Sequence, residues 1–345
     1  MILPERIRNE EELDEILSTP YSDTIGAINR IKGDIMILGA GGKIGPSLVV
    51  TALKAIKKGS ERKKVYAVSR FARSDEEITR KLEEQGAIII KADLSDPDQV
   101  KTLPEVDNVI FMVGKKFGTS EDPGQTWISN SLVAGLVARK YGKSNLIIFS
   151  TGNVYPLVPI TTNGSTEEDE VNPVGEYGWS ALARERIFSY YIKNLQGKGA
   201  ILRLNYACEL RYGVLLDIAL KVYKGEAIDL RTGYVNVIWQ GDVNNIALRL
   251  LEYANNPPLI INVTGPIVKV RDIANEFGKL LNKEPVFKYA EEETALLSNP
   301  SKMTKMLGQP KVSISMMVKW IAEWLINNGK IYNLPTHYDV RDGRF

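Results

Sequence analysis

Histidine and cysteine are almost absent from this sequence of 345 residues, which holds one of each, His337 and Cys208. A single cysteine allows no intrachain disulfide, and one histidine with one cysteine cannot form a His/Cys metal cluster. A metal site built from carboxylates alone stays open, but we expect no metal. A Ser-His-Asp hydrolase is disfavoured, because the only histidine lies in a polar C-terminal tail. The chemistry must rest on Tyr, Ser or Thr, Lys, Arg or a cofactor.

Long hydrophobic runs and an excess of one charge are also missing. The apolar stretches are well below the roughly 20 residues of a membrane-spanning helix. The 44 basic residues balance 42 acidic ones, and no basic run is interleaved with aromatic residues, so we expect no membrane and no nucleic acid as partner. The first residues show no charged-then-apolar signal pattern. These features predict a soluble, cytoplasmic protein.

What the sequence does contain is a regular alternation of strand-like and helix-like segments. Apolar runs typical of buried strands occupy residues 34–38, 64–68, 87–91, 108–113, 145–150 and 199–204. Segments with helical spacing lie between them, at 43–58, 75–86, 123–142 and 176–197. This alternation predicts an α/β fold with a doubly wound parallel sheet of the Rossmann type.

The alternation of strand-like and helix-like segments becomes less regular after Asn205. We therefore divide the chain into four parts. We expect an N-terminal surface extension at 1–32 and a Rossmann dinucleotide-binding domain at 33–205. Residues 206–330 are predicted to form most of a smaller α/β lobe, which binds substrate and returns strands to the main sheet. Residues 331–345 form a C-terminal tail.

A glycine turn joins the first predicted strand to the first helix of the Rossmann domain. Its spacing is G-x-x-G-x-x-G, whereas most dehydrogenases have G-x-G-x-x-G. Without Cβ atoms, the backbone N–H groups can approach a pyrophosphate, and the helix N-terminus adds partial positive charge. The residues of this turn predicted to bind NAD or NADP are Gly39, Gly41, Gly42, Lys43, Ile44 and Gly45.

The end of the second strand bears on the choice between NAD and NADP. An acidic residue there would accept hydrogen bonds from the ribose 2′-hydroxyl of NAD, but here Ser69 and Arg70 follow the strand. A guanidinium suits the 2′-phosphate of NADP, and Arg73 is a second candidate. We therefore prefer NADP over NAD. The alternative is that Arg70 is a solvated loop charge.

Several further motifs stand in a characteristic order. They are Ala92 to Asp96 after the third strand, Ser150 to Tyr155 at the end of the fifth, Tyr177 to Glu185 on a helix, and Val237 to Asp242. With the glycine turn, they make the chain from about residue 34 to 330 resemble the extended short-chain dehydrogenase/reductase family, also called the NAD-dependent epimerase/dehydratase family. This resemblance implies adenine contacts at Asp93 and Leu94.

The resemblance also implies catalytic roles. In that family a tyrosine exchanges a proton with a substrate hydroxyl or carbonyl while hydride passes to or from nicotinamide, and a Ser or Thr hydrogen-bonds the same oxygen. These roles fall on Tyr177 and Thr151, with Ser150 as the nearest substitute. Tyr177 would also contact the cofactor. An ordinary hydroxyl at the end of a strand is the alternative for Thr151.

The sequence departs from the family at the lysine of the Y-x-x-x-K motif, which is replaced by Ala181. That ammonium favours ionisation of the tyrosine, and an unassisted tyrosine is only about one part per thousand ionised at pH 7. Base catalysis should suffer more than acid catalysis, so reduction survives the loss better than oxidation.

A second lysine offers partial compensation. Val113, Gly114 and Lys116 follow the fourth strand in a segment that resembles the A-G-L-K segment of UDP-galactose 4-epimerases. By this resemblance all three contact the cofactor, and Lys116 is a candidate to replace the missing lysine. Two adjacent lysines at the start of a loop are otherwise typical of a solvated surface.

Four residues are candidates for substrate binding. Leu202 to Tyr206 resembles the family's R-x-x-N loop, whose asparagine faces substrate, and this assigns Asn205. Asn153 follows Thr151, and Arg211 and Arg231 could hold a carboxylate or phosphate by forked hydrogen bonds. Either arginine could instead form a surface or interlobe ion pair.

The sequence leaves two kinds of function open. The first is an NAD(P)-dependent reductase, epimerase or dehydratase acting on a sugar or sugar acid, with dehydration disfavoured because Gly152 and Asn153 replace that subclass's acidic pair. The second is a sensor or scaffold that binds the cofactor but has lost catalysis with the lysine. A homodimer is expected, because this family pairs the helices at 123–142 and 176–197 between subunits. The apolar side chains on them are Trp127, Ile128, Leu132, Leu136, Ile187, Tyr190 and Tyr191.

Overall fold

The computed structural model describes residues 3–72 and 75–344 of the chain. Its centre is a seven-stranded sheet with the order β11-β7-β5-β4-β1-β2-β3, in which every neighbouring pair is parallel. The strands are β1 (Ile35–Leu38), β2 (Val65–Ser69), β3 (Ile88–Lys91), β4 (Asn108–Phe111), β5 (Asn145–Thr151), β7 (Lys198–Leu204) and β11 (Leu259–Val263). The predicted fold class is confirmed, and the six predicted strands are all present.

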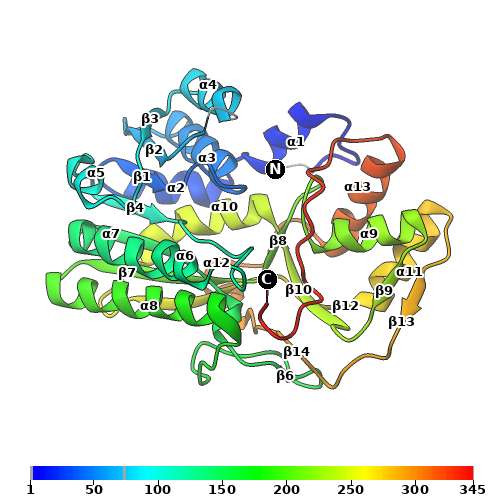
Figure 1. Ribbon diagram of the computed structural model, residues 1–345. Coiled ribbons are helices and arrows are strands. Elements are labelled where there is room, and N and C mark those ends of the chain that lie inside the picture. Colours follow the sequence, from blue (N-terminus) through cyan, green and yellow to red (C-terminus); the bar gives the residue numbers. More distant parts are fainter. Residues whose placement is uncertain (1–2, 73–74, 345) are drawn as a thin grey trace.

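The sheet is covered by helices on both faces, as Figure 1 shows. Successive residues of β1 point to opposite sides, because Ile35 and Ile37 belong to one core cluster and Met36 and Leu38 to the other. This explains why the strands read as continuous apolar runs. The first cluster packs against α2 (Ser22–Arg30), α3 (Gly45–Lys58), α4 (Glu76–Glu84), α10 (Gln240–Arg249) and α12 (Ser301–Leu307). The second packs against α5 (Pro97–Thr102), α7 (Val133–Tyr141) and α8 (Gly175–Leu195).

The predicted helix at 123–142 is one continuous helical segment with a local change of winding. It consists of α6 (Pro123–Trp127), a π-helical turn at Ile128–Leu132 and α7. π-Helical turns inside α-helices are frequent at functional sites. Asn130, in this turn, is a fully buried polar residue.

The smaller lobe has its own core, built around Trp239, Trp320 and Phe277. Its sheets are β12-β10-β8 and β13-β9, with a short β14-β6 pair beside them. The strands are β6 (Val158–Pro159), β8 (Tyr206–Cys208), β9 (Ala227–Asp229), β10 (Tyr234–Trp239), β12 (Ile267–Lys269), β13 (Val286–Lys288) and β14 (Thr294–Ala295). The helices are α9 (Val214–Lys224), α11 (Val270–Leu281) and α13 (Ile314–Ile326). From this region α10, β11 and α12 return to the main sheet.

The N-terminal segment lies against the domain over much of its length. Leu13 and Leu17 of α1 (Glu10–Leu17) belong to the core of the smaller lobe, and Ile28 of α2 belongs to the core of the Rossmann domain. The segment predicted as a surface extension thus buries apolar side chains in both parts of the molecule.

The C-terminal segment crosses from the smaller lobe toward the start of α8, as the red trace in Figure 1 shows. The Thr336 N–H and hydroxyl both donate to Asp217 Oδ2, at 2.8 and 2.6 Å. Farther along, Arg341 donates to the carbonyl of Thr294 at 2.7 Å. The predicted tail is therefore an ordered strap between the two parts. Across the described ranges, no helix is long and apolar enough to span a membrane.

Candidate functional site

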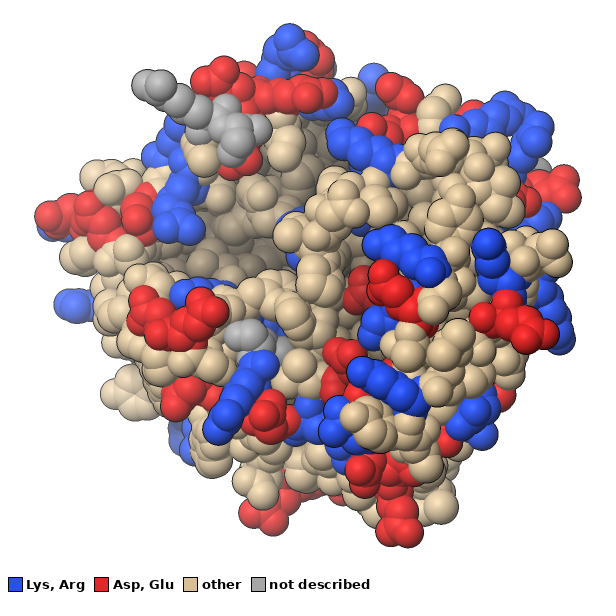
Figure 2. Space-filling model, turned by 45° about the vertical axis from the view of Figure 1, so that its right-hand side comes forward, with Lys and Arg blue, Asp and Glu red and all other residues tan. Residues whose placement is uncertain are grey.

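The candidate site lies at the carboxyl edge of the parallel sheet. The chain order reverses between β1 and β4, and open α/β sheets bind ligands in the crevice at such a point. Figure 2 shows a hollow with mainly uncharged walls on the face turned to the viewer, with charged side chains around it. The strand ends bring five sequence-predicted groups to this edge: the glycine turn, Ser69, Val113, Thr151 and Asn205.

The glycine turn has a shape that side chains would prevent. Gly39 has φ +93°, and a Cβ there would lie 3.1 Å from the backbone N of Val113. A Cβ on Gly45 would lie 2.3 Å from the carbonyl oxygen of Ala40, and one on Gly41 would lie 2.9 Å from Ser69 Oγ. Helix α3 then begins with no acidic residue in its first turn. The turn therefore fits a dinucleotide pyrophosphate.

The residues predicted to contact the adenosine half of the cofactor lie near the ends of β2 and β3. Arg70 is exposed beside the end of β2, and Leu94 is buried. Hydrogen bonds from the Ser95 hydroxyl and N–H lower the pKa of Asp93, and the charge of Arg70 adds to this effect. Arg70 and Asp93 thus lie near each other at the ends of β2 and β3. Arg73 lies outside the described residues.

A pocket of about 220 Å³ lies at the other end of the crevice. Most of the predicted catalytic and substrate-binding residues line it, together with aromatic and polar residues of the smaller lobe. Its lining residues are Lys43, Ile44, Lys116, Ser150, Thr151, Asn153, Tyr177, Leu204, Asn205, Tyr206, Ala207, Tyr212, Val214, Gln240, Leu296 and Thr336. No aspartate or glutamate occurs in this set.

The two hydroxyls at the end of β5 have different hydrogen-bonding roles. Thr151 Oγ1 accepts from the N–H of Asn153 at 3.1 Å and from its side-chain amide at 3.0 Å. With its lone pairs engaged, Thr151 has its proton left to donate. Ser150 already donates its proton to Glu185 at 2.5 Å. Thr151 is therefore the better donor to a substrate oxygen.

The Ser150 anchor is part of a buried polar network. Glu185 accepts two parallel hydrogen bonds from Arg203, from Nε at 3.0 Å and from Nη2 at 2.8 Å. Arg203 also donates to the Tyr155 hydroxyl at 2.8 Å. Burial raises the pKa of Tyr155 to about 12, so this hydroxyl stays protonated. The network fixes the end of β5 against α8 and β7.

Tyr177 lies in the first turn of α8 and lines the pocket. The following Gly178 lets this turn lie close to Asn153, because a Cβ there would meet the Asn153 carbonyl oxygen at 2.6 Å. Ala181, at the position of the family's lysine, is fully buried in a small apolar cluster with Val154 and Leu182.

Two lysines line the pocket, and their amines lie 5.1 and 5.6 Å from the same Phe117 ring centroid. Burial lowers the pKa of Lys116 to about 8, with a further contribution from the charge of Lys43. Desolvation also lowers the pKa of Lys43 to about 8, although much of this residue faces solvent. Lys43 Nζ lies 3.3 Å from the Tyr212 ring centroid, and Lys116 Nζ donates to the Thr336 carbonyl at 3.3 Å. This part of the pocket favours an anionic ligand.

Asn205 presents an amide ready for a ligand. The residue is 6% exposed, and neither its Oδ1 nor its Nδ2 has a hydrogen-bond partner among the described residues. Buried amides normally find partners, and one that lacks them inside a pocket wall is typical of a ligand-binding position. Gly152 makes room for this side chain, since a Cβ there would lie 2.6 Å from Asn205 Oδ1.

The structure does not bring the two predicted arginines to the pocket lining. Arg211 donates to Asp14 at 2.8 Å and also pairs with Glu209. Arg231 pairs with Asp229 at 2.7 Å on the outside of the smaller lobe. Both therefore form the ion pairs that the sequence left open as the alternative. Among 3–72 and 75–344, no group of three or more His, Cys, Asp or Glu residues could hold a metal ion.

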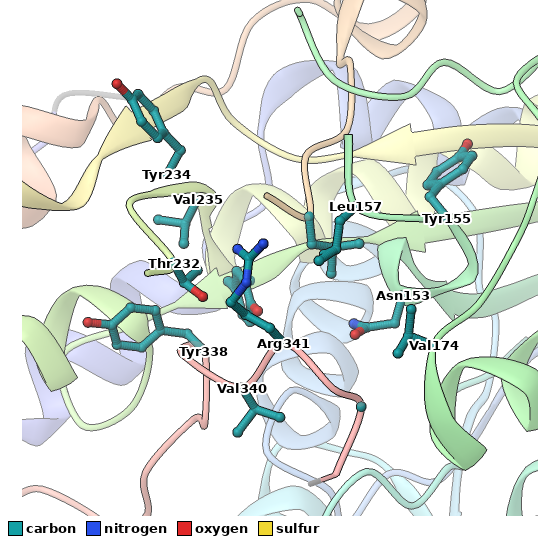
Figure 3. A pocket seen from close by; sticks show the side chains of 13 residues that line it. Asn153, Tyr155, Leu157, Val174, Thr232, Tyr234, Val235, Tyr338, Val340 and Arg341 are labelled. Atoms are coloured by element: carbon teal, nitrogen blue, oxygen red, sulfur yellow. The ribbon is translucent and has the colours of Figure 1, made fainter. Parts of the chain in front are cut away.

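The C-terminal strap forms part of the wall between the lobes. Figure 3 shows Arg341 and Tyr338 of the strap together with Thr232 of the smaller lobe and Asn153 and Leu157 of the Rossmann side. The cavity among them holds only about 30 Å³. The strap thus fills the space beside the 220 Å³ pocket and limits its extent.

Sequence reasoning missed two buried polar residues beneath the site. The amide of Asn130 accepts from the N–H of Lys115 at 2.8 Å and donates to the Ser180 hydroxyl at 2.9 Å. Arg184 donates from Nη1 to the Val113 carbonyl at 2.9 Å. Together they connect α8 to the loop after β4. The spacing of Arg184, seven residues after Tyr177, was the one signal in the sequence that both lie on the same helix face.

Comparison with known proteins gives the family. The model of the NAD dependent epimerase/dehydratase family matches residues 35–213. A search of curated proteins finds no match.

Several solved structures share the fold. UDP-glucuronic acid 4-epimerase from Bacillus cereus, solved with UDP-glucuronic acid and NAD, has 19% identity and a TM-score of 0.72 over 86% of this chain and 99% of its own. UDP-glucose 4-epimerase from Thermotoga maritima has 18% identity and a TM-score of 0.70 over 86% and 99%. UDP-glucose 4-epimerase from Thermus thermophilus, solved with NAD, has 22% identity and a TM-score of 0.67 over 84% and 98%.

Proposed function

Since the chain belongs to the NAD dependent epimerase/dehydratase family, we propose that it is an NAD(P)-dependent oxidoreductase or epimerase acting on a sugar or sugar acid. The observation that carries the proposal is the pocket that joins Tyr177, Thr151 and Asn205 at the end of the dinucleotide crevice. The proposal is supported because a proton donor, a polarising hydroxyl and an amide without a partner would then surround one small volume.

The residues of the crevice fit a nicotinamide dinucleotide. The glycine turn and the N-terminus of α3 would hold the pyrophosphate, and Asp93, Leu94 and Ser69 the adenosine half. When bound, the cofactor supplies the hydride transfer that the protein's own side chains cannot perform. Exposed Arg70, in place of an acidic residue, supports a preference for NADP over NAD. Val113, Gly114 and Lys116 would border the nicotinamide half.

Proton chemistry falls to the hydroxyls of the pocket. Thr151 would donate a hydrogen bond to the substrate oxygen, because both Asn153 contacts use it as an acceptor. Tyr177 would transfer the proton to or from the same oxygen. Asn205 would fix a second polar group of the substrate.

The pocket favours a small substrate with an anionic group. Its volume of about 220 Å³ lies below the roughly 300–1,000 Å³ of sites for drug-sized ligands. Lys43 and Lys116 line it, and its lining contains no acidic side chain. A sugar acid satisfies both conditions better than a nucleotide-linked sugar.

The proposal is tested with NADPH and NADH oxidation against a panel of keto sugars and keto acids. Tyr177→Phe should reduce turnover at least about 100-fold, the contribution typical of a positioned acid or base. Tyr289→Phe serves as control, because this tyrosine is 63% exposed on the smaller lobe. Activity untouched by Tyr177→Phe would contradict the mechanism.

A second candidate is a cofactor-binding sensor or scaffold, which the buried Ala181 favours. It predicts tight NAD(P)H binding, measured by nucleotide fluorescence, with no turnover across the whole panel. The same measurements therefore separate the two functions.

A homodimer completes the proposal. Of the apolar side chains predicted for the subunit contact, the exposed ones are Trp127, Ile128, Leu132 and Tyr190. They lie on two neighbouring helical segments, α6 with its π-helical turn and α8, which contact each other. A second copy of the chain could pair these segments into a four-helix bundle.

A further inference from the structure

Arg184 carries a buried charge whose acidic neighbour, Glu185, is hydrogen-bonded to Arg203. Only 4% of the residue is exposed, and no ion pair involves it among the described residues. Its Nη1 donates to the Val113 carbonyl at 2.9 Å, while its Nε has no hydrogen-bond partner. Burying a guanidinium in this way costs free energy, as the lowered pKa of Arg184, caused by its desolvation, also indicates. A residue that only filled space would carry no charge here.

The guanidinium lies directly under the cofactor crevice. A Cβ on Gly114 would come within 2.8 Å of Arg184 Nη1, and Gly114 itself is exposed toward the crevice. Val113, whose carbonyl takes the hydrogen bond, is in turn the residue that Gly39 of the glycine turn approaches. Arg184 therefore supports the loop over which the nicotinamide half of the cofactor would lie.

The arginine shares a helix face with Tyr177 and Ala181. Residues at i, i+4 and i+7 stack on one side of an α-helix, and side chains tilt toward its N-terminus. From this face of α8 the Arg184 guanidinium meets the loop after β4, at the Val113 carbonyl and beside Gly114.

We propose that Arg184 is a positioning residue that supplies, from the next turn of α8, the positive charge that Ala181 does not supply. It acts through the Val113–Gly114 loop, whose Val113 carbonyl it holds by a hydrogen bond. The proposal rests on the proposed function, but it makes a claim about cofactor binding that needs no known substrate. Lys116 would then serve the ligand side of the pocket.

The test compares Arg184→Met with Arg184→Lys and with the double variant Arg184→Met/Ala181→Lys. Fluorescence titration of the purified protein with NADH and NADPH gives the dissociation constants. Arg184→Met should weaken binding of the preferred nucleotide about tenfold, the loss of one hydrogen bond to a charged group. Arg184→Lys should retain most of the affinity, and the double variant should regain it.

The matched control is Arg249→Met. Arg249 also donates to a backbone carbonyl, that of Leu307 at 2.7 Å, but it lies on α10 away from the pocket. Its loss should change melting temperature without changing nucleotide affinity. If Arg184→Met behaves like this control, Arg184 is structural and the proposal is wrong.

With a substrate in hand, the KM for the nucleotide adds a second readout. It should rise about tenfold in Arg184→Met, in step with the dissociation constant, and Ala181→Lys in that background should lower it again. An unchanged KM with intact Tyr177 dependence would overturn the role of Arg184 while leaving the proposed function standing. Failure of the Tyr177→Phe test would instead remove the proposed function.

Discussion

Adjacent residues at the carboxyl edge can have opposite hydrogen-bonding states, and this decides which of them is available for chemistry. Ser150 and Thr151 are equivalent as hydroxyls in the sequence, yet Ser150 gives its proton to Glu185 and Thr151 only accepts. The sequence motif identifies both hydroxyls as candidates. Only their hydrogen bonds, to Glu185 and from Asn153, show which of them has a proton left to donate. The same holds for Asn205, whose unsatisfied amide becomes apparent only when its surroundings are known.

At Arg70 we predict a change in cofactor preference. Arg70→Ala should weaken NADPH binding at least about tenfold and leave NADH binding nearly unchanged, because only NADP carries the 2′-phosphate. Titration by nucleotide fluorescence gives both constants. Arg80→Ala is the control, since Arg80 is 69% exposed on α4. Equal losses for both nucleotides would show that Arg70 does not read the phosphate.

At Lys116 we predict a distinctive dependence of stability on pH. Burial lowers its pKa from 10.5 to about 8 in the folded protein. Between these values the unfolded chain binds more protons, so this residue makes the free energy of unfolding rise with pH between about 8 and 10. In Lys116→Met that contribution should vanish. Urea unfolding of both proteins at pH 7.5, 8.5 and 9.5 measures it, with Lys57→Met as an exposed control.

At the scale of elements, sequence periodicity was enough to predict the strands of the main sheet, but not the short helices or the strands of the smaller lobe. The six predicted strands and the helices between them match the structure because both faces of the sheet are buried. The short α5 and α12 and the edge strands of the smaller lobe carry too few residues to show a period. The smaller lobe was expected to return strands to the main sheet, and the strand that does so is β11, which pairs with β7.

The N-terminal helices show why a hydrophilic pattern can mislead. The segment 1–32 has a polar sequence. Many of its apolar side chains nevertheless pack in the core, and several of its polar groups form hydrogen bonds with a distant helix, α10. Asn245 of that helix accepts from the Tyr21 N–H at 2.8 Å and from the Thr24 hydroxyl at 2.7 Å. It also donates to the carbonyls of Thr19 and Gly241. Contacts across more than 200 residues leave no local signal.

This bridge predicts that the N-terminal segment contributes to the stability of the whole domain. Asn245→Ala should lower the free energy of unfolding by at least about 2 kcal/mol, because it leaves two buried donors without acceptors. The control is Asn327→Ala, an exposed residue with one local hydrogen bond. Urea unfolding followed by circular dichroism measures both. Equal stability of the two variants would show that the segment is only peripheral.

At the scale of the whole molecule, the C-terminal strap and the smaller lobe define what the Rossmann domain can accept. The strap contributes Thr336 to the pocket and holds it with hydrogen bonds to Asp217 and from Lys116. A tail of 15 residues without periodicity gave no hint of this path. The pocket's small size thus comes from a segment that sequence reasoning treated as separate from the site.

The outer face of the Rossmann domain carries exposed apolar side chains that are relevant to the oligomeric state. Leu132 is 47% exposed and Tyr190 63% exposed, on two neighbouring helical segments. With Trp127 and Ile128 they give these two contacting segments a stripe of four exposed apolar side chains, of the kind that a second copy covers.

We therefore predict that the wild-type protein has twice the mass of one chain in solution and that Leu132→Asp/Tyr190→Asp has the mass of one. Each buried aspartate would lose its hydration without gaining a partner, which opposes association. Light scattering coupled to size-exclusion chromatography measures the masses. Tyr289→Asp, equally exposed at 63% on the smaller lobe, should leave the dimer intact. A wild-type protein of single-chain mass, or a double variant that still dimerises, would assign this stripe to another role.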